Sequence, residues 1–375
     1  MIFPSFGDAA DYDRLGRACA AALSGQEGRV FDACYHPVRP PGVALFMSLP
    51  HLLTADAVDA AYIALALNLL CAAAGLFGLY RVFAGDAALL AGWGARARVL
   101  GALVFASLVP NLVPHLPVRL GDLPALAVFL LAVAVAARVV MRGGEGPSRR
   151  WQCGLAGALC AASFLLKISQ LPAALLLMLA LVLLPRGRAP RARMRDGAAF
   201  LVGFAPALLQ FLNVWAHGGH FWFYDPEYMR TWFSYPGREW GVDAMIFERP
   251  QRGAYLVRVD TPISLATLVV LRLYRGLFGF EWAIYHDVAA RGPWWSLSTA
   301  EWAAAWLLVL GFLALSAAIV WRGPPSLRLL NAVSAPLAVV TAVVEHTELR
   351  YYALPRTVLW LSLALIALQR WRGRA

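Results

Sequence analysis

Long apolar runs separated by short polar segments dominate the sequence. Nine of these runs are candidate membrane spans, at residues 57–80, 99–118, 122–141, 151–166, 171–184, 197–214, 299–321, 329–344 and 353–369. Several are shorter than the roughly 20 residues that a helix perpendicular to the bilayer needs. Two further apolar stretches, 41–53 and 262–280, are short or interrupted by Arg and are typical of interfacial or re-entrant helices. The pattern predicts an all-α polytopic membrane protein.

Composition agrees with the pattern and narrows the class. Of the 375 residues, 60% are hydrophobic and 15% are charged, whereas a soluble domain carries about 25% charged residues. This excludes a disordered chain, a small disulfide-rich secreted module and an ordinary soluble enzyme. Cys19 and Cys34 share one polar segment and would pair if that segment faces an oxidising compartment; otherwise they are buried thiols.

The basic residues follow the positive-inside rule. Alternating spans place five segments on the cytoplasmic side: 81–98, 142–150, 185–196, 322–328 and 370–375. Together with Arg138 they hold just over half of the 33 Lys and Arg residues, but only three of the 22 acidic ones. This asymmetry fixes the orientation. It also argues against a nucleic-acid partner, which would need the net charge of +11 on one solvated face.

We therefore predict that residues 1–375 form a single membrane domain. Its parts are an outer segment at 1–56, transmembrane helices at 57–214, an outer loop rich in Arg and aromatic residues at 215–298, and C-terminal transmembrane helices at 299–375. The outer segment starts without a span before it, and residues 1–6 are too short for the apolar core of a signal peptide. We expect a first transmembrane helix to be missing from this sequence; the alternative is that the short N-terminus is translocated as span 57–80 inserts.

Three acidic residues stand together in the first outer segment, at Asp8, Asp11 and Asp13. Asp8 and Asp11 are three residues apart and share one face of a helix. Two neighbouring carboxylates suit a general base that accepts a proton from a hydroxyl group, or the binding of a divalent cation. They are equally typical of the first turn of an ordinary helix, where the helix dipole favours negative charge.

Candidate cations occur at several outer positions. His36 and Arg39 precede Pro40-Pro41-Gly42, a turn before an apolar run. Lys167, the only lysine, lies between two short apolar helices, where it either meets a lipid phosphate or extends its amine to the interface. The Arg and aromatic residues of loop 215–298 suit phosphate and sugar recognition or an interfacial belt. His217 and His220 have too few neighbours for a metal site.

Four segments together resemble the GT-C superfamily of membrane glycosyltransferases. The similarity is greatest to the protein O-mannosyltransferases and the bacterial lipid A aminoarabinose transferases. The segments are GDAADYDRLGRACAAALSG, YHPVRPPGVALF, RLGDLPALAVFLLAVAVAAR with Gly121-Asp122, and ELRYYALP near the last span. No single motif is diagnostic, but their order and shared outer placement match the family.

The resemblance implies roles for individual residues. Asp8 would be the catalytic base and Asp11 its acidic neighbour, in an inverting displacement at the anomeric carbon of a sugar carried on polyprenyl phosphate. Cations would stabilise the leaving phosphate. The implied substrate-binding residues are His36, Arg39, Asp122, Lys167, Glu348, Arg350 and Tyr351.

We therefore predict a mannosyltransferase-like hexosyl- or pentosyltransferase of the cell envelope. It would act on the outer face of a bacterial-type inner membrane, with a polyprenyl-phosphate sugar donor, a lipid, glycan or protein acceptor, and membrane lipids as its partners. The sequence requires no cofactor and predicts no resident metal, although a divalent cation at Asp8 and Asp11 is compatible with it.

Two other classes stay open at this point. A lipid or solute transporter, or a flippase, would carry charges inside its spans and broken helices in corresponding halves. Pro110, Pro114 and Pro117 break one span without a matching half, and the acidic residues lie outside the spans. A catalytically inactive membrane assembly protein is the third class.

Overall fold

The described part of the chain is mostly helical. The computed structural model describes residues 8–26, 28–84, 86, 96–112, 121–142, 147–185, 187–225, 262–279, 298–344 and 352–372. These residues contain no β-strand, and the single backbone bridge joins His36 to Arg39. The prediction of an all-α protein is confirmed. The chain divides into two compact units, Met1–Arg230 and Thr231–Ala375, which are described separately; the single membrane domain stays a prediction.

The first unit contains most of the helices. In order they are α1 (Asp8–Leu23), α2 (Val30–Ala33), α3 (Pro41–Leu53), α4 (Ala57–Ala84), α6 (Arg96–Leu112), α7 (Asp122–Arg142), α8 (Pro147–Leu166), α9 (Leu171–Leu183), α10 (Pro190–Phe204) and α11 (Leu208–Gly218). Short 3-10 turns, Ile168–Gln170 and Ala205–Ala207, connect α8 to α9 and α10 to α11.

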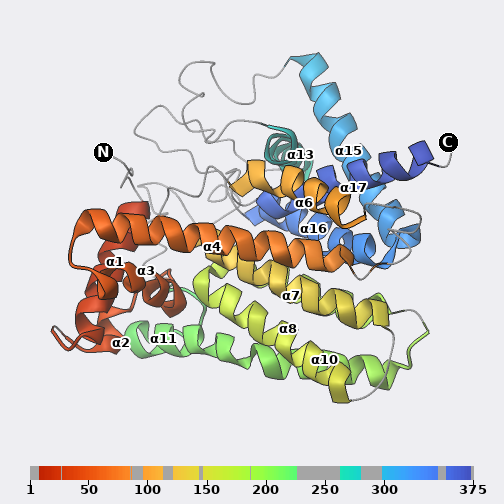
Figure 1. The fold of residues 1–375 in the computed structure, drawn as a ribbon. Helices are drawn as coiled ribbons and strands as arrows, with labels where there is room; N and C mark the ends of the chain where they lie inside the picture. Colours follow the sequence, from red (N-terminus) through yellow and green to blue (C-terminus); the bar gives the residue numbers. More distant parts are fainter. Residues whose placement is uncertain are drawn as a thin grey trace. The chain divides into compact units, whose positions relative to one another are not determined.

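Helices α4, α7, α8 and α10 lie side by side in a layer (Figure 1), each packed on the next. Contacts between α8 and α10 advance in the same direction along both helices, from Arg149–Asp196 to Gly154–Gly203, so the two helices run parallel. Helix α1 packs on α3, which in turn contacts α4 and α8. The segment 41–53, predicted as an interfacial helix, is α3.

Two glycines bring the beginnings of α3 and α7 against the end of α8. A Cβ added to Gly42 would lie 2.6 Å from the carbonyl oxygen of Leu165, and one added to Gly121 would lie 2.6 Å from that of Leu166. Such distances are too short for any side chain, so backbone meets backbone at both points. Arg39, Asp122 and Lys167 are each within three residues of these contacts, and the contacts therefore bring their segments together.

All nine predicted spans fall on helices wherever the structure describes them. By length and apolar composition, five helical segments can cross a membrane: Ala57–Phe83, Asp122–Met141, Pro190–Gly218, Thr299–Arg322 and Pro325–Val343. The spans predicted at 99–118, 171–184 and 353–369 correspond to shorter apolar helices, and residues 113–118 lie outside the described part.

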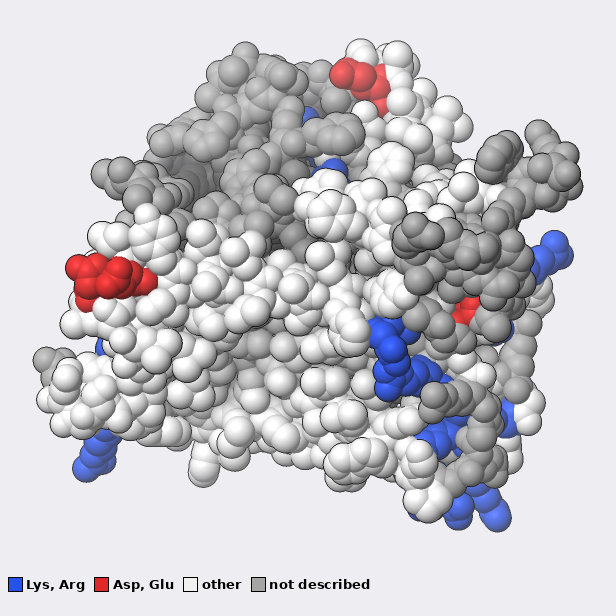
Figure 2. Space-filling model, viewed as in Figure 1, with Lys and Arg blue, Asp and Glu red and all other residues white. Residues whose placement is uncertain are grey.

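Two of the predicted cytoplasmic turns are shorter than expected. Helix α8 begins at Pro147 and α10 at Pro190, because proline is favoured in the first turn of a helix. Arg149 and Arg193 are therefore helical residues and not loop residues. In Figure 2 the blue Arg side chains gather at the lower right, where α8 and α10 begin in Figure 1. Helix α8 has 20 residues, about 30 Å of rise, so this end lies a membrane thickness away from Lys167.

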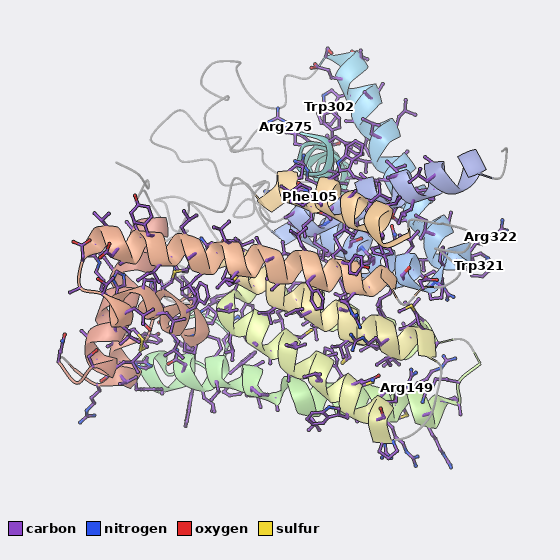
Figure 3. All side chains as sticks on the ribbon, in the orientation of Figure 1. Phe105, Arg149, Arg275, Trp302, Trp321 and Arg322 are labelled. Carbon is purple, nitrogen blue, oxygen red and sulfur yellow. A yellow bond between two sulfur atoms is a disulfide. The ribbon has the colours of Figure 1, made fainter. Side chains whose placement is uncertain are left out.

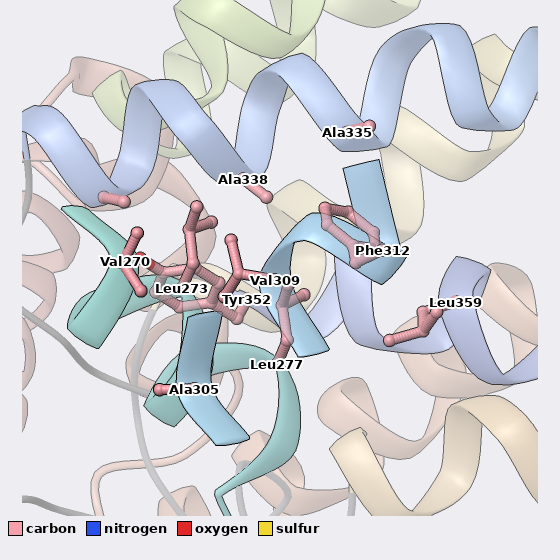
Figure 4. Packing of buried hydrophobic residues seen from close by; sticks show 11 residues of the cluster. Val270, Leu273, Leu277, Ala305, Val309, Phe312, Ala335, Ala338, Tyr352 and Leu359 are labelled. Atoms are coloured by element: carbon pink, nitrogen blue, oxygen red, sulfur yellow. The ribbon is translucent and has the colours of Figure 1, made fainter. Parts of the chain in front are cut away.

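The second unit packs four described helices: α13 (Pro262–Phe278), α15 (Thr299–Arg322), α16 (Pro325–Val344) and α17 (Ala353–Arg372). Ser298 and Glu301 form a capping box at the start of α15. Trp302 and Trp321 lie near its two ends (Figure 3), as aromatic residues do at membrane interfaces. A cluster around Leu273, Phe312 and Tyr352 forms the core (Figure 4).

We expect Gly42→Ala to lower the free energy of unfolding by about 1–3 kcal/mol, because the new methyl group would force α3 away from α8. Thermal denaturation of the purified protein in detergent measures this. Gly101→Ala in α6 is the matched control, since nothing lies within 4 Å of its added Cβ, and it should leave stability unchanged or slightly raised. Equal effects of the two substitutions would contradict the packing role of Gly42.

Candidate functional site

Arg39 is a buried cation at the start of α3. Its residue exposure is only 6%, and its guanidinium group stacks over the ring of Tyr12 at 4.2 Å from the centroid. Its Nη2 atom lies 3.5 Å from Oδ2 of Asp11. Cation–π stacking and an opposite charge both favour a desolvated guanidinium. The two contacts from α1 therefore hold Arg39 in one orientation.

The turn that presents Arg39 is built by His36. The Nδ1 atom of His36 accepts a hydrogen bond from the backbone of Val38, and the backbone N–H of Arg39 donates to the carbonyl oxygen of His36. Pro40 and Pro41 then start α3 with backbone angles that suit a helix N-terminus. His36, predicted as a substrate-binding residue, thus also shapes the turn before Arg39.

Asp11 is held ionised by arginines. Burial by itself raises the pKa of Asp11, but a hydrogen bond from Arg14, the charges of Arg39 and Arg14, and a hydrogen bond from Arg39 outweigh it, so the pKa lies below its ordinary value. A carboxylate with a lowered pKa is a weak proton acceptor. This environment suits Asp11 to orienting Arg39 rather than to acting as a base.

Asp13 has a separate set of partners. One oxygen lies 3.0 Å from Nε2 of His51 in α3, and the other accepts hydrogen bonds from Arg17. Because α1 and α3 pack along their length, this pair fastens the middle of α1 to the end of α3. Asp11 therefore contacts the segment before α3, whereas Asp13 contacts the end of α3.

Lys167 and Asp122 form a second ion pair, which is largely buried. The Nζ atom of Lys167 lies 2.6 Å from Oδ1 of Asp122, and each side chain is only 11% exposed. The lysine follows the last residue of α8, and the aspartate is the first residue of α7. The sequence placed both residues on the outer side but did not reveal that they are partners.

A disulfide joins α1, the helix that carries Asp11 and Asp13, to the segment that precedes Arg39. It joins Cys19 in α1 to Cys34 at the end of α2, so of the two alternatives for these cysteines, pairing is the one observed. Beside it, the imidazole of His217 stacks on Tyr35 with centroids 3.8 Å apart, and its Nε2 atom lies 3.3 Å from Asp32. His217 therefore fastens α11 to the α2 segment.

Some predicted residues lie outside the described part. Asp8 is the first residue of α1, but its side chain is not among those described. Neither the backbone nor the side chains of Glu348, Arg350 and Tyr351 are described. Tyr352 of the same motif is fully buried, against Gly276 of α13, so it belongs to the core of the second unit. Their predicted roles stay predictions.

Metal binding is also untested at the acidic pair. Among the described side chains, no group of three or more His, Cys, Asp or Glu residues is arranged to hold a metal ion. Since the side chain of Asp8 is not among those described, a divalent cation at Asp8 and Asp11 stays a prediction.

The sequence did not reveal the roles of Tyr12 and His51, because stacking and pairing between α1 and α3 depend on how the helices pack.

The structure is similar to that of ArnT from Cupriavidus metallidurans in the apo state, a lipid A aminoarabinose transferase of the GT-C class. The similarity covers 96% of this chain with a TM-score of 0.53 and 16% sequence identity. The chain spans 55% of the length of that protein. No protein-family model and no curated protein matches the sequence. The GT-C fold that the motifs implied is thus confirmed.

Replacing Lys167 alone removes the cation that lies 2.6 Å from Asp122. We expect Lys167→Met to lower the free energy of unfolding by about 3–5 kcal/mol, and the double variant with Asp122→Asn to lower it by less, because no unpaired charge is then buried. Chemical denaturation in detergent measures both. Arg14→Met is the control: the Arg14 side chain is 79% exposed, so its loss should cost at most about 1 kcal/mol. A double variant less stable than the single one would show that the two charges are not coupled.

Removing the disulfide that holds α1 should also lower the free energy of unfolding. With a sequence separation of 15 residues, the double variant Cys19→Ser/Cys34→Ser should lose about 3 kcal/mol of stability. Reduction of the wild-type protein should produce the same loss and leave the double variant unchanged. Cys71→Ser, at an unpaired cysteine, controls for the loss of a thiol. An effect of reduction on the double variant would mean that another feature responds to the reductant.

Proposed function

We propose that this chain, which has a GT-C fold, is an integral membrane glycosyltransferase. Its donor would be a sugar carried on polyprenyl phosphate, and its acceptor a lipid, a glycan or a protein on the outer side of the membrane. The observation that carries the proposal is the cation arrangement in the first unit. Arg39 is buried and Lys167 is largely buried, each is paired with a carboxylate, and both lie within three residues of the contacts between α3, α7 and α8.

Two cations held in this way suit a leaving phosphate. In the reaction, the acceptor hydroxyl oxygen forms a bond to the anomeric carbon while the bond from that carbon to the phosphate oxygen breaks. The electron pair of the broken bond stays on the phosphate, whose charge becomes more negative. Fixed cations stabilise this developing charge more than they stabilise the bound donor, and such differential binding lowers the barrier.

The proton of the acceptor hydroxyl needs a base. We assign this role to Asp8, which begins α1 one helical turn before Asp11. Asp11 has a lowered pKa and contacts Arg39, so we assign it to positioning that guanidinium. Asp122 positions the amine of Lys167 in the same manner. Each cation would then have its own carboxylate, and Asp8 would be left to accept the proton.

Two observations support an outward-facing site. The disulfide between Cys19 and Cys34 is typical of an oxidising compartment, and it lies in the helix that carries Asp11. The Arg-rich beginnings of α8 and α10 lie at the opposite end of the first unit, as expected for a cytoplasmic face. The active site would therefore face the extracytoplasmic side of a bacterial-type inner membrane.

Sugar transfer in membranes that contain the full chain tests the proposal. A panel of radiolabelled polyprenyl-phosphate sugars serves as donors, with wild type compared to Asp8→Asn. Loss of the general base should reduce the rate by about 10²–10⁴-fold. The matched control is Asp59→Asn, an exposed acid in the first turn of α4, which should keep the wild-type rate.

Each result has a distinct meaning. Transfer that depends on Asp8 but not on Asp59 would establish the enzyme class, and the active donor would identify the sugar. Equal transfer by wild type and Asp8→Asn would remove Asp8 from the mechanism. If no donor in the panel supports transfer, the glycosyltransferase proposal is wrong for this chain, and lipid transport or a non-catalytic role takes its place.

A further inference from the structure

The turn that presents Arg39 is held from a second side, by α11 and the residues that follow it. Helix α11 ends beside α2 (Figure 1). The imidazole of His217, in the last turn of α11, stacks on Tyr35 with centroids 3.8 Å apart and ring planes within 7° of parallel. The same imidazole stacks on Phe31 at 4.5 Å. Because Tyr35 lies four residues before Arg39, this stack fixes the chain at the start of the turn.

The chain after α11 returns to the turn itself. Gly219 ends α11 with a left-handed backbone at φ 72°, a conformation that favours glycine. The buried side chain of Gln210 then donates a hydrogen bond to the carbonyl oxygen of Phe223 at 2.9 Å, which holds the returning segment against α11. At the end of this segment the backbone N–H of Asp225 donates to the carbonyl oxygen of Pro37 at 2.8 Å. One continuous segment therefore holds the turn at two points.

The position of this turn decides where the guanidinium of Arg39 lies. The backbone N–H of Arg39 donates to the carbonyl oxygen of His36, so the side chain moves with the turn. Tyr12 and Asp11 of α1 contact the guanidinium, and they orient it only when the turn brings it to them. A displacement of about 1 Å at a reacting centre can reduce a rate by about 10²-fold, so small shifts of the turn would be felt.

We infer that His217, through its stack on Tyr35, is a positioning residue for Arg39. The inference deepens the proposed function and rests on it for the effect on sugar transfer, because Arg39 is assigned there to the leaving phosphate. His217 would act through the turn and not on the substrate. Its effect on the turn does not depend on what the chain catalyses, and the two effects are measured separately.

Hydrogen–deuterium exchange of the purified full chain in detergent measures the effect on the turn. Residues 37–41 are Pro-Val-Arg-Pro-Pro, and proline has no amide hydrogen, so this segment reports only on Val38 and Arg39. Both amides donate to His36. His217→Ala should speed their exchange by about three- to tenfold, the loss of one aromatic stack, and should leave the amides of residues 45–53 in α3 unchanged.

Two variants separate the stack from other consequences of the substitution. His217→Phe keeps a ring against Tyr35 and should restore the wild-type exchange to within about twofold. Trp215→Ala is the matched control, because it removes a 57% exposed aromatic ring from the same turn of α11, and it should leave the exchange of Val38 and Arg39 unchanged.

Sugar transfer measures the consequence for the proposed reaction. Arg39→Gln should lower the rate by about 10²-fold, the loss of one preorganised donor, and His217→Ala should lower it by about tenfold. In the Arg39→Gln background, His217→Ala should cause no further loss, because a residue that acts through Arg39 has no effect once that side chain is removed. A residue with only a general structural role would lower the rate equally in both backgrounds.

The outcomes separate this inference from the proposed function. Unchanged exchange of Val38 and Arg39 in His217→Ala, or equally fast exchange in His217→Phe, would overturn the positioning role whatever the transfer assay shows. Faster exchange in His217→Ala alone, in a protein that transfers no sugar, would support the positioning role and reject the proposed function. If His217→Ala does not fold, Tyr35→Leu removes the other ring of the stack and should produce the same changes.

Discussion

Backbone contact at Gly42 and Gly121 is the constraint on which the charged site of the first unit depends. At these two points the beginnings of α3 and α7 touch the last residues of α8, and any larger residue would separate them. The charged residues of the site lie within three residues of these contacts: Arg39, Asp122 and Lys167. Their arrangement follows from close backbone packing, and the ion pairs then fix the side chains within it.

The ion pairs of this site lie largely out of water, and the side chain of Asp11, at 32% exposure, is the most exposed of the four. Removing a cation and a carboxylate from water is costly, so a cluster such as Arg39 with Asp11, or Lys167 with Asp122, is weak evidence for stability. Under the proposed function, such a cluster would serve as a pre-organised receptor for an anion.

The two ends of the first unit use arginine in different settings. At the end with α1, Arg39 is held by an aromatic ring and a carboxylate that α1 contributes. At the opposite end, Arg149 is held by α7 and α10 within the bundle itself. The parallel direction of α8 and α10 explains the second setting, because it brings two positive helix ends and several basic residues together.

The sequence by itself determined the helical class, the positions of the apolar helices, the charge asymmetry and the motifs that resemble the GT-C superfamily. These properties depend on local composition and periodicity, which one chain displays directly. The partners of Arg39, Lys167, Asp13 and Arg149 were decided only by the tertiary structure. Tyr12, Asp122, His51 and Asp196 become neighbours of these residues because helices distant in sequence pack side by side, and the spacing of residues along one chain carries no record of that contact. The same reason explains the disulfide: the cysteines were visible as a candidate pair, but the packing of α1 against α2 decided that they meet.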